Sequence, residues 1–246
     1  MRFLAALQFL TIIPWKWSVD PGEAGRSTGY FPVIGAIIGA ILVGLHYLLG
    51  WLLPPPVVNV LLVVAMVIVT GALHLDGLVD TCDGLGSAKT PEDRWQVMHD
   101  SRAGGFGVIG AGCLLLTKYV VLNSVPPGLM MATLVLMPVV SRWTMVYAIA
   151  AYPYARPSGL GKLFKQGTDR WQLVLATVVA LAVAVALFKL WGLVIMFGVW
   201  VIIALVAGYL KRRFAGLTGD TYGAINEVAE VGVLLIISLL AYKDWL

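Results

Sequence analysis

Charged residues are scarce in this sequence, and cysteine is nearly absent. Asp, Glu, Lys and Arg make up only 12% of the 246 residues and hydrophobic residues 60%, whereas a soluble domain carries about 25% charge. This composition excludes a disordered chain, a nucleic-acid-binding arm and an ordinary cytosolic enzyme. The 2 cysteines, Cys82 and Cys113, form neither a metal-ligand pair nor a disulfide framework. The sequence therefore predicts a polytopic membrane protein.

Seven apolar stretches are long enough, or nearly so, to cross the hydrocarbon layer, which takes about 20 helical residues. They span residues 30–53, 57–73, 105–125, 129–152, 173–188, 190–210 and 231–242. The last stretch is short, and we expect its helix to begin near Asn226. We therefore expect one all-α membrane domain over residues 1–246, a helical bundle with about seven transmembrane helices.

Residues 1–13 are apolar but too short to cross a membrane. They end at a proline and lack the basic start and cleavage site of a signal peptide, so we expect a helix lying in the membrane interface. Trp15 and Trp17 are then expected at the level of the lipid headgroups. Gly35 and Gly39 offer a face for close helix packing, which favours self-association as a homo-oligomer.

Basic residues alternate between the connections of these spans. Thirteen of the 17 Lys and Arg residues fall in the N-terminal segment and in the second, fourth and sixth connections, and only Lys189 and Lys243 fall on the other side. Lys118 and Arg142 lie within spans. The positive-inside rule predicts that the charged side of this multi-pass protein, and the N-terminus with it, lies in the cytoplasm. Its net charge of +4 then reflects cytoplasmic loops and contact with membrane lipid, not nucleic acid.

Three aspartates at helical spacing make residues 74–86 the most informative segment. Asp76, Asp80 and Asp83 are spaced i, i+4 and i+7, which places them within an arc of about 60° on a helix. No Lys or Arg stands between them to offset their repulsion. Carboxylate oxygens suit Mg²⁺ or Mn²⁺ better than Zn²⁺, so the stripe predicts a divalent-cation site. The alternative is a solvated acidic helix end.

Two further polar clusters adjoin spans on the same predicted side. In residues 99–107, Asp100 could complete a metal shell, and Arg102 has the planar guanidinium that binds phosphate through two hydrogen bonds. The glycines of this segment open a helix, and they either leave its N-terminus free to bind an anion or allow close helix packing. In residues 216–230, an aspartate precedes an amide and two glutamates on one helix face. Together the clusters could hold two cations, or one cation beside a hydrogen-bonding pocket.

Arginine and histidine side chains complete the set. Arg26 and Arg156 lie in glycine-rich and proline-rich loops, and Arg142 lies inside the fourth span, where it needs an anionic partner. For Arg142, substrate contact and pairing with an acid of the bundle are equal alternatives, and His74 is either a binding residue or a neutral helix position. Carboxylates, a divalent cation and arginines at one membrane face are the groups that phosphoryl transfer requires.

A series of motifs resembles the adenosylcobinamide-GDP ribazoletransferase (cobalamin synthase) family along nearly the whole chain. The motifs are residues 25–32, 71–84, 98–108, 141–143, 152–157 and 217–227. The resemblance implies an enzyme of cobalamin biosynthesis in the inner membrane of a bacterial or archaeal cell. It implies that this enzyme joins adenosylcobinamide-GDP to α-ribazole or α-ribazole 5′-phosphate, releases GMP and requires Mg²⁺. It also implies that the ribazole 3′-hydroxyl attacks the cobinamide-linked phosphorus and that Asp76, Asp80 and Asp83 hold the metal.

The residues and the resemblance together give three sets of candidates. The expected metal ligands are Asp76, Asp80, Asp83, Asp220, Glu227 and Glu230. The expected catalytic residues are Asp80, Asp83 and Asp100. The expected substrate-binding residues are Arg26, His74, Arg102, Arg142, Arg156 and Asn226.

Two other functions fit the sequence less well. A CDP-alcohol phosphotransferase also carries spaced aspartates, but Val79 and Asp80 stand where its pattern has alanine and arginine. A transporter or cation channel would place ionisable groups near the middle of the bilayer and often shows internal repeats. The acids here gather at one predicted face, and no repeat is visible.

Overall fold

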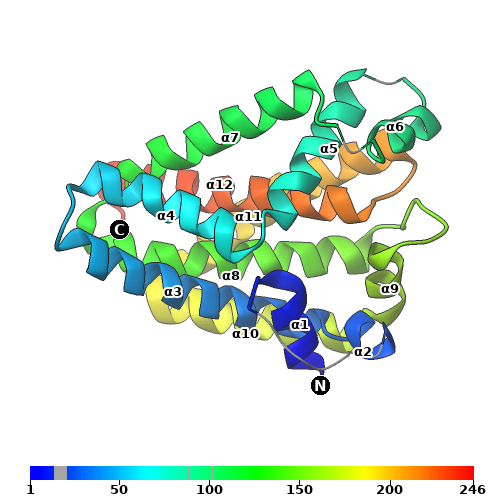
Figure 1. Ribbon diagram of the computed structural model, residues 1–246. Helices are drawn as coiled ribbons and strands as arrows, with labels where there is room; N and C mark the ends of the chain where they lie inside the picture. The colour runs from blue at the N-terminus through cyan, green and yellow to red at the C-terminus, as the bar shows by residue number, and fades with distance from the viewer. Residues whose placement is uncertain (14–20, 88, 101) are drawn as a thin grey trace.

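The computed structural model describes residues 1–13, 21–87, 89–100 and 102–246, which form an all-helical bundle (Figure 1). Trp15 and Trp17 lie outside the described residues. In chain order the helices are α1 (Arg2–Leu10), α2 (Pro21–Gly25), the short 3-10 helix η1 (Thr28–Tyr30), α3 (Phe31–Gly50), α4 (Pro55–Val69), α5 (Leu73–Ser87), α6 (Pro91–Val97), α7 (Gly105–Asn123), α8 (Pro127–Ala151), α9 (Leu160–Gly167), α10 (Arg170–Phe188), α11 (Leu190–Phe214) and α12 (Gly219–Tyr242).

Six helical segments are long and apolar enough to cross a membrane, and a bent pair makes up to seven. The six are Thr28–Gly50, α7, α8, α10, α11 and α12. The pair consists of α4 and α5, which meet at an angle of 88°. The expected multi-pass helical bundle is therefore confirmed, with a sharp bend in its second span that the sequence did not predict.

Local signals explain where several of these helices begin and end. Lys189 separates α10 from α11 and has a left-handed φ of 53°, which matches the weak break expected there. The last span begins at Gly219, well before Asn226, because Thr218 and Thr221 form a reciprocal capping box. The polar side chains within residues 220–230 therefore belong to the helix itself.

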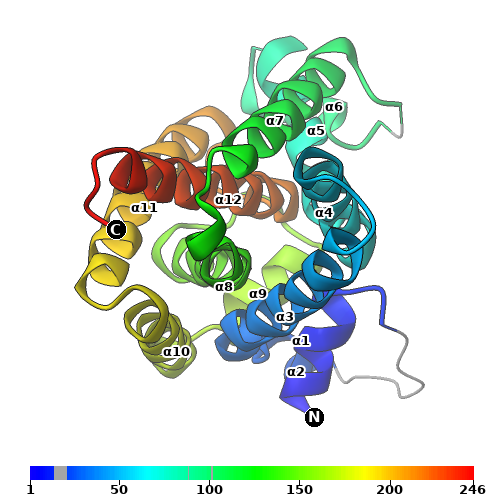
Figure 2. The same cartoon turned by 90° about the vertical axis from the view of Figure 1, so that its left-hand side faces the viewer.

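Helix α8 forms the centre of the bundle, with α3, α10, α11 and α12 around it in the end-on view (Figure 2). Its side chains at Leu136, Val139 and Val140 are fully buried. The small-residue face of α3 packs on it so closely that a Cβ atom at Gly39 would lie 2.6 Å from Val135 Cα. This face is used inside the chain, so it offers no free surface for self-association.

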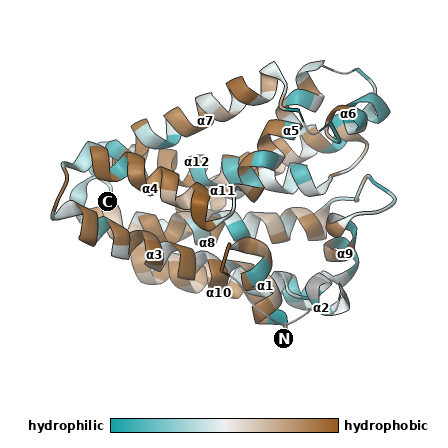
Figure 3. Ribbon diagram, viewed as in Figure 1, coloured by the Kyte–Doolittle hydropathy of each residue, from teal (hydrophilic) through white to brown (hydrophobic). Residues whose placement is uncertain are grey.

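The connections rich in basic residues all lie at one end of the bundle. This end holds the C-termini of α5, α8 and α11, the N-termini of α7, α10 and α12, and the short helices α6 and α9 (Figure 1). Figure 3 shows hydrophobic residues along the long helices and hydrophilic residues concentrated around α5 and α6. We call the end of the bundle that holds these basic connections the basic end.

Candidate functional site

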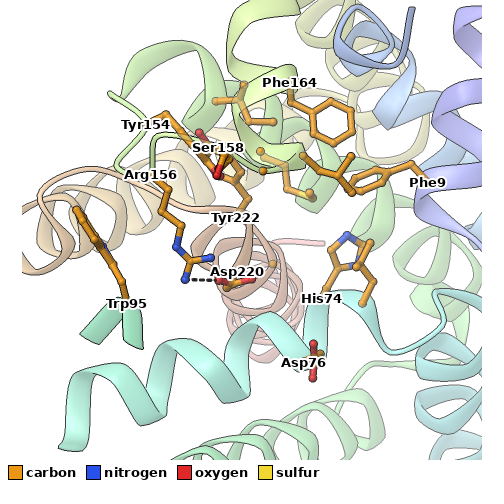
Figure 4. A pocket seen from close by; sticks show the side chains of 18 of the residues that line it. Phe9, His74, Asp76, Trp95, Tyr154, Arg156, Ser158, Phe164, Asp220 and Tyr222 are labelled. Atoms are coloured by element: carbon orange, nitrogen blue, oxygen red, sulfur yellow. Dashed lines mark hydrogen bonds and ion pairs between the residues drawn. The ribbon is translucent and has the colours of Figure 1, made fainter. Parts of the chain in front are cut away.

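A cavity of about 470 Å³ lies at the basic end, where α1, α5, α8, α9 and α12 come together (Figure 4). Much of its wall is apolar and includes Phe9, Phe31 and Phe164. Its polar lining comes from segments far apart in the sequence. These residues are His74, Asp76, His99, Arg156 and Asp220. Five of the six motifs noted in the sequence thus meet at one cavity, since Phe31 adds the motif at residues 25–32.

A short backbone pairing brings two of these motifs together. The loop after α8 and the segment before α12 form an isolated parallel bridge between Tyr154 and Leu217. The Ala155 N–H donates to the Leu217 carbonyl at 2.8 Å, and the Leu217 N–H donates to Pro153 at 2.8 Å. This pairing fixes the loop that carries Arg156 beside the first turn of α12.

Arg156 and Asp220 face each other in the cavity (Figure 4). Arg156 Nη2 lies 3.1 Å from Asp220 Oδ2, which is an ion pair without the alignment of a hydrogen bond. Both atoms are buried and have no hydrogen-bond partner in the described part of the chain. Because an unsatisfied buried polar group costs about 1–3 kcal/mol, this pair retains capacity to bind a polar ligand.

Close packing of α5 on α12 brings the aspartate stripe to the same place. A Cβ atom at Gly77 would lie 2.6 Å from the Asp220 carbonyl oxygen, so only glycine allows this approach. Asp76 lines the cavity, and the half-buried Asp80 lies within electrostatic range of Asp76, Asp220 and Arg156. Asp76, Asp220 and Arg156 therefore share the polar end of the cavity, and Asp80 lies near them without lining it.

Asp83, the third aspartate of the stripe, has a different environment. Its Oδ2 accepts a hydrogen bond from Gly104 N–H at 2.7 Å, and its Oδ1 accepts one from Gly107 N–H at 2.8 Å. These N–H groups belong to the first turn of α7, where a negative charge is stabilised by the helix dipole. The anion expected at this glycine-rich helix start is thus a carboxylate of the chain itself.

Asp100 and Arg102 form an exposed ion pair at a second hollow of about 660 Å³, which Asp83 also lines. Arg102 Nη2 lies 2.7 Å from Asp100 Oδ2, and the hydrogen bonds from Arg102 lower the pKa of Asp100 to about 2. Neither residue lines the aromatic cavity. Arg26 lies elsewhere again, exposed beside Glu23 in a third hollow.

A buried ion-pair network inside the bundle takes up four further candidates. Lys118 Nζ contacts Glu227 Oε2 at 2.6 Å and Glu230 Oε2 at 2.5 Å. Arg142 Nη1 pairs with Glu230 Oε1, which also accepts a hydrogen bond from Asn226 at 3.0 Å. Of the two alternatives left open for Arg142, the structure shows pairing with an acid of the bundle. None of these residues lines the cavity.

The described residues contain no group of three or more His, Cys, Asp or Glu side chains close enough to hold a metal ion alone. The six expected ligands are divided among three places. Asp76 and Asp220 line the cavity with Asp80 near them, Asp83 caps α7, and the two glutamates pair with Lys118 and Arg142. The donors at the cavity are carboxylate oxygens, which are the ligands that Mg²⁺ prefers.

The family model described as cobalamin-5-phosphate synthase matches residues 2–238. The chain belongs to this family. Relatives named adenosylcobinamide-GDP ribazoletransferase include one from Desulforamulus reducens, 37% identical over 95% of this chain and 94% of the relative. Another, from Geotalea daltonii, is 38% identical over 97% of this chain and 96% of the relative. A third, from Roseiflexus sp., is 38% identical over 96% of this chain and 88% of the relative. No solved structure matches the chain.

This cobalamin-5-phosphate synthase family member is an enzyme, and the match contains all six motifs on which the resemblance was based. Sequence reasoning did not single out the aromatic side chains that line the cavity. Tyr154 and Tyr222 lie within two of the quoted motifs, and that position was the available signal. Phe9 and Phe164 lie outside the motifs, and in an apolar sequence nothing distinguishes them from core residues.

Proposed function

We propose that the chain joins adenosylcobinamide-GDP to α-ribazole, or to α-ribazole 5′-phosphate, and releases GMP. The observation that carries this proposal is the convergence of Asp76, Asp80, Asp220 and Arg156 at one end of an aromatic cavity. Family membership supports the same reaction, since the relatives are named for it. The single membrane domain over residues 1–246 would then be a transferase domain.

The reaction breaks the phosphoanhydride bond of the donor and forms a phosphodiester to the acceptor. The 3′-hydroxyl oxygen of the ribazole forms a bond to the cobinamide-linked phosphorus, and the bond from this phosphorus to the bridging oxygen breaks. GMP leaves with the electron pair, and the hydroxyl proton passes to a carboxylate of the acid cluster. Arg156 would hold a phosphoryl oxygen through its free N–H groups, which offsets charge that grows in the transition state.

Asp76, Asp80 and Asp220 fit a Mg²⁺ ion by the chemistry of their donors. Asp220 Oδ2 is buried with Arg156 as an ion-pair partner but without an aligned hydrogen-bond donor, and one guanidinium leaves the three nearby carboxylates with an excess of negative charge that a cation would offset. Mg²⁺ commonly binds one or two carboxylates, several waters and substrate phosphates, so no three-residue cage is needed. When bound, the ion would neutralise phosphate charge. Asp83, Glu227 and Glu230 are not part of this proposed site because their oxygens already have partners.

The proposed active site faces the cytoplasm. The cavity lies at the basic end of the bundle, and basic connections are retained on the cytoplasmic side of a membrane. This orientation places the N-terminus inside the cell. A nucleotide-linked donor would then reach the site from the cytoplasm, while the bundle remains surrounded by lipid.

The test uses the purified full-length protein in detergent with adenosylcobinamide-GDP, α-ribazole and Mg²⁺. We expect equimolar GMP and adenosylcobalamin by chromatography, loss of both after chelation with EDTA, and recovery when Mg²⁺ is restored. A parallel reaction with α-ribazole 5′-phosphate identifies the preferred acceptor. Absence of GMP with either acceptor would refute the proposed reaction, and turnover that persists in EDTA would refute the metal requirement.

Asp80→Asn should reduce GMP release by at least about 100-fold, because it removes a carboxylate from the cluster that binds the cation or accepts the proton. The melting temperature should not fall, since the substitution removes one of several like charges. The measurement pairs initial rates with thermal unfolding in the same detergent. Near-wild-type turnover at saturating Mg²⁺ would exclude Asp80 from the chemistry.

A further inference from the structure

We infer that the aromatic cavity binds the flat base of the acceptor nucleoside, so that it sets specificity for a benzimidazole base. This inference rests on the proposed function and adds to it which of the two substrates occupies the cavity. The corrin ring and the guanine of the donor would remain outside the cavity.

The walls of the cavity suit a planar aromatic group. Phe9 and Phe164 have ring centroids 4.5 Å apart, and Phe31 lies 5.9 Å from Phe9 and 5.7 Å from Phe164. Tyr154 and Tyr222 form a second aromatic pair with centroids 6.4 Å apart. Aromatic side chains gain free energy by packing against another ring in stacked or edge-on arrangements.

The size of the cavity favours the smaller substrate. Its volume is about 470 Å³, and pockets of about 300–1,000 Å³ enclose a single drug-sized ligand. A two-ring base with its ribose belongs to that size class. A corrinoid linked to a nucleoside diphosphate is several times larger, so the cavity cannot enclose it.

Two buried polar side chains in the cavity have no partner. His74 is 1% exposed and Tyr222 is 2% exposed. Neither ring nitrogen of His74 nor the Tyr222 hydroxyl has a hydrogen-bond partner in the described part of the chain. Both residues line the cavity, so a ligand there gains hydrogen bonds that the protein does not make for itself.

Two unpartnered polar side chains beside the apolar wall of the cavity suit the benzimidazole base of α-ribazole better than guanine. A benzimidazole nucleoside has one free ring nitrogen, which accepts a single hydrogen bond, and its remaining edge is apolar. Guanine has several donors and acceptors along its edge, and an apolar wall would leave most of them unsatisfied. The Tyr222 hydroxyl or the His74 N–H can donate the one hydrogen bond that the benzimidazole needs.

The position of the cavity also orients the nucleoside. In Figure 4, Phe9 and Phe164 lie near each other, Asp76 lies apart from them, and His74 lies between. A base packed against the phenylalanines directs its ribose towards Asp76, Asp220 and Arg156. The attacking hydroxyl then lies on the side of the cavity that carries the carboxylates and the guanidinium.

The test compares Michaelis constants for the two substrates in Phe164→Trp and Phe197→Trp. Phe164 is 4% exposed in the cavity, whereas Phe197 is 65% exposed on the outer face of α11. A tryptophan at 164 fills space meant for the base, so KM for α-ribazole should rise at least about 10-fold. KM for adenosylcobinamide-GDP should stay within about twofold, and Phe197→Trp should change neither constant.

Tyr222→Phe gives a second readout that does not depend on a change in packing volume. The wild type should prefer α-ribazole over an analogue whose base is indole, which lacks the accepting nitrogen, by about 10-fold in kcat/KM. Tyr222→Phe should lose most of this preference if the hydroxyl is the donor, and His74→Leu should lose it if the imidazole is. Retention of the full preference in both variants would overturn the hydrogen-bond assignment.

The outcomes separate this inference from the proposed function. A raised KM for adenosylcobinamide-GDP with an unchanged KM for α-ribazole would assign the cavity to the donor and overturn the inference. Unchanged constants for both substrates in Phe164→Trp would also overturn it. Failure of the wild-type protein to release GMP would instead refute the reaction itself.

Discussion

At the scale of single residues, Lys118 shows how tertiary contacts decide the role of a charge. It lies in an apolar span and is 3% exposed, yet its ammonium group contacts two glutamates of α12. Glu230 in turn pairs with Arg142 on α8. Three helices are thus joined by two cations and two anions in the interior, where the cost of burying charge is offset only while every member has a partner.

We predict that Lys118→Met destabilises the protein by about 3–5 kcal/mol, because it leaves two buried carboxylates of which Arg142 pairs with Glu230 alone among the described ion pairs. The free energy of unfolding is measured by detergent-induced denaturation in mixed micelles. The double variant Lys118→Met/Glu227→Gln restores charge balance and should recover at least half of the loss. A single variant as stable as the wild type would show that the network does not hold the bundle together.

The sequence predicted part of the site at this scale and missed part for a geometric reason. Asp76, Asp80, Asp220 and Arg156 were all expected, and they meet at the cavity. Glu230 lies ten residues beyond Asp220 on α12, which is about 15 Å along a helix. Spacing within one helix revealed the acids but not which cations on α7 and α8 face them, because that depends on how the helices pack.

At the scale of elements, the contact between α5 and α12 positions the acids of the site. Gly77 lies where the two backbones touch, so a side chain there must push the helices apart. The bend between α4 and α5 makes this contact, and it uses left-handed backbone at Gly71 and Ala72, with φ of 60° and 57°. Alanine rarely adopts this conformation, so the bend could not be predicted from the residues that form it.

We predict that Gly77→Ala lowers turnover by at least about 10-fold, since displacement of catalytic groups by about 1 Å can cost 100-fold. Overpacking should also lower stability by about 1–3 kcal/mol. Gly112→Ala is the matched control, because a Cβ atom there meets nothing within 4 Å. The comparison uses GMP release and unfolding of both variants. Equal activity in the two would mean that the α5–α12 contact does not position the acids.

At the scale of the whole molecule, the sequence predicted the fold class and the arrangement of charge more reliably than it predicted the site. The length of apolar runs and the alternation of basic connections depend on the membrane as a solvent, and both can be read along one chain. The helical bundle confirms the membrane spans predicted from the apolar runs. The basic connections lie together at one end of the bundle, which agrees with their alternation along the sequence. The aromatic cavity depends on side chains from separate helices, and no single stretch of sequence encodes it.

The proposed orientation predicts which loops are accessible from each side of the membrane. Lys89 lies in the exposed connection between α5 and α6 at the basic end, and Ser124 lies in the exposed connection between α7 and α8 at the opposite end. In a Cys82→Ala/Cys113→Ala background, spheroplasts are treated with a membrane-impermeant maleimide. Ser124→Cys should react in intact spheroplasts, whereas Lys89→Cys should react only after permeabilisation. The reverse pattern would place the acids and the aromatic cavity outside the cell, away from the cytoplasmic nucleotides on which the proposed transfer depends.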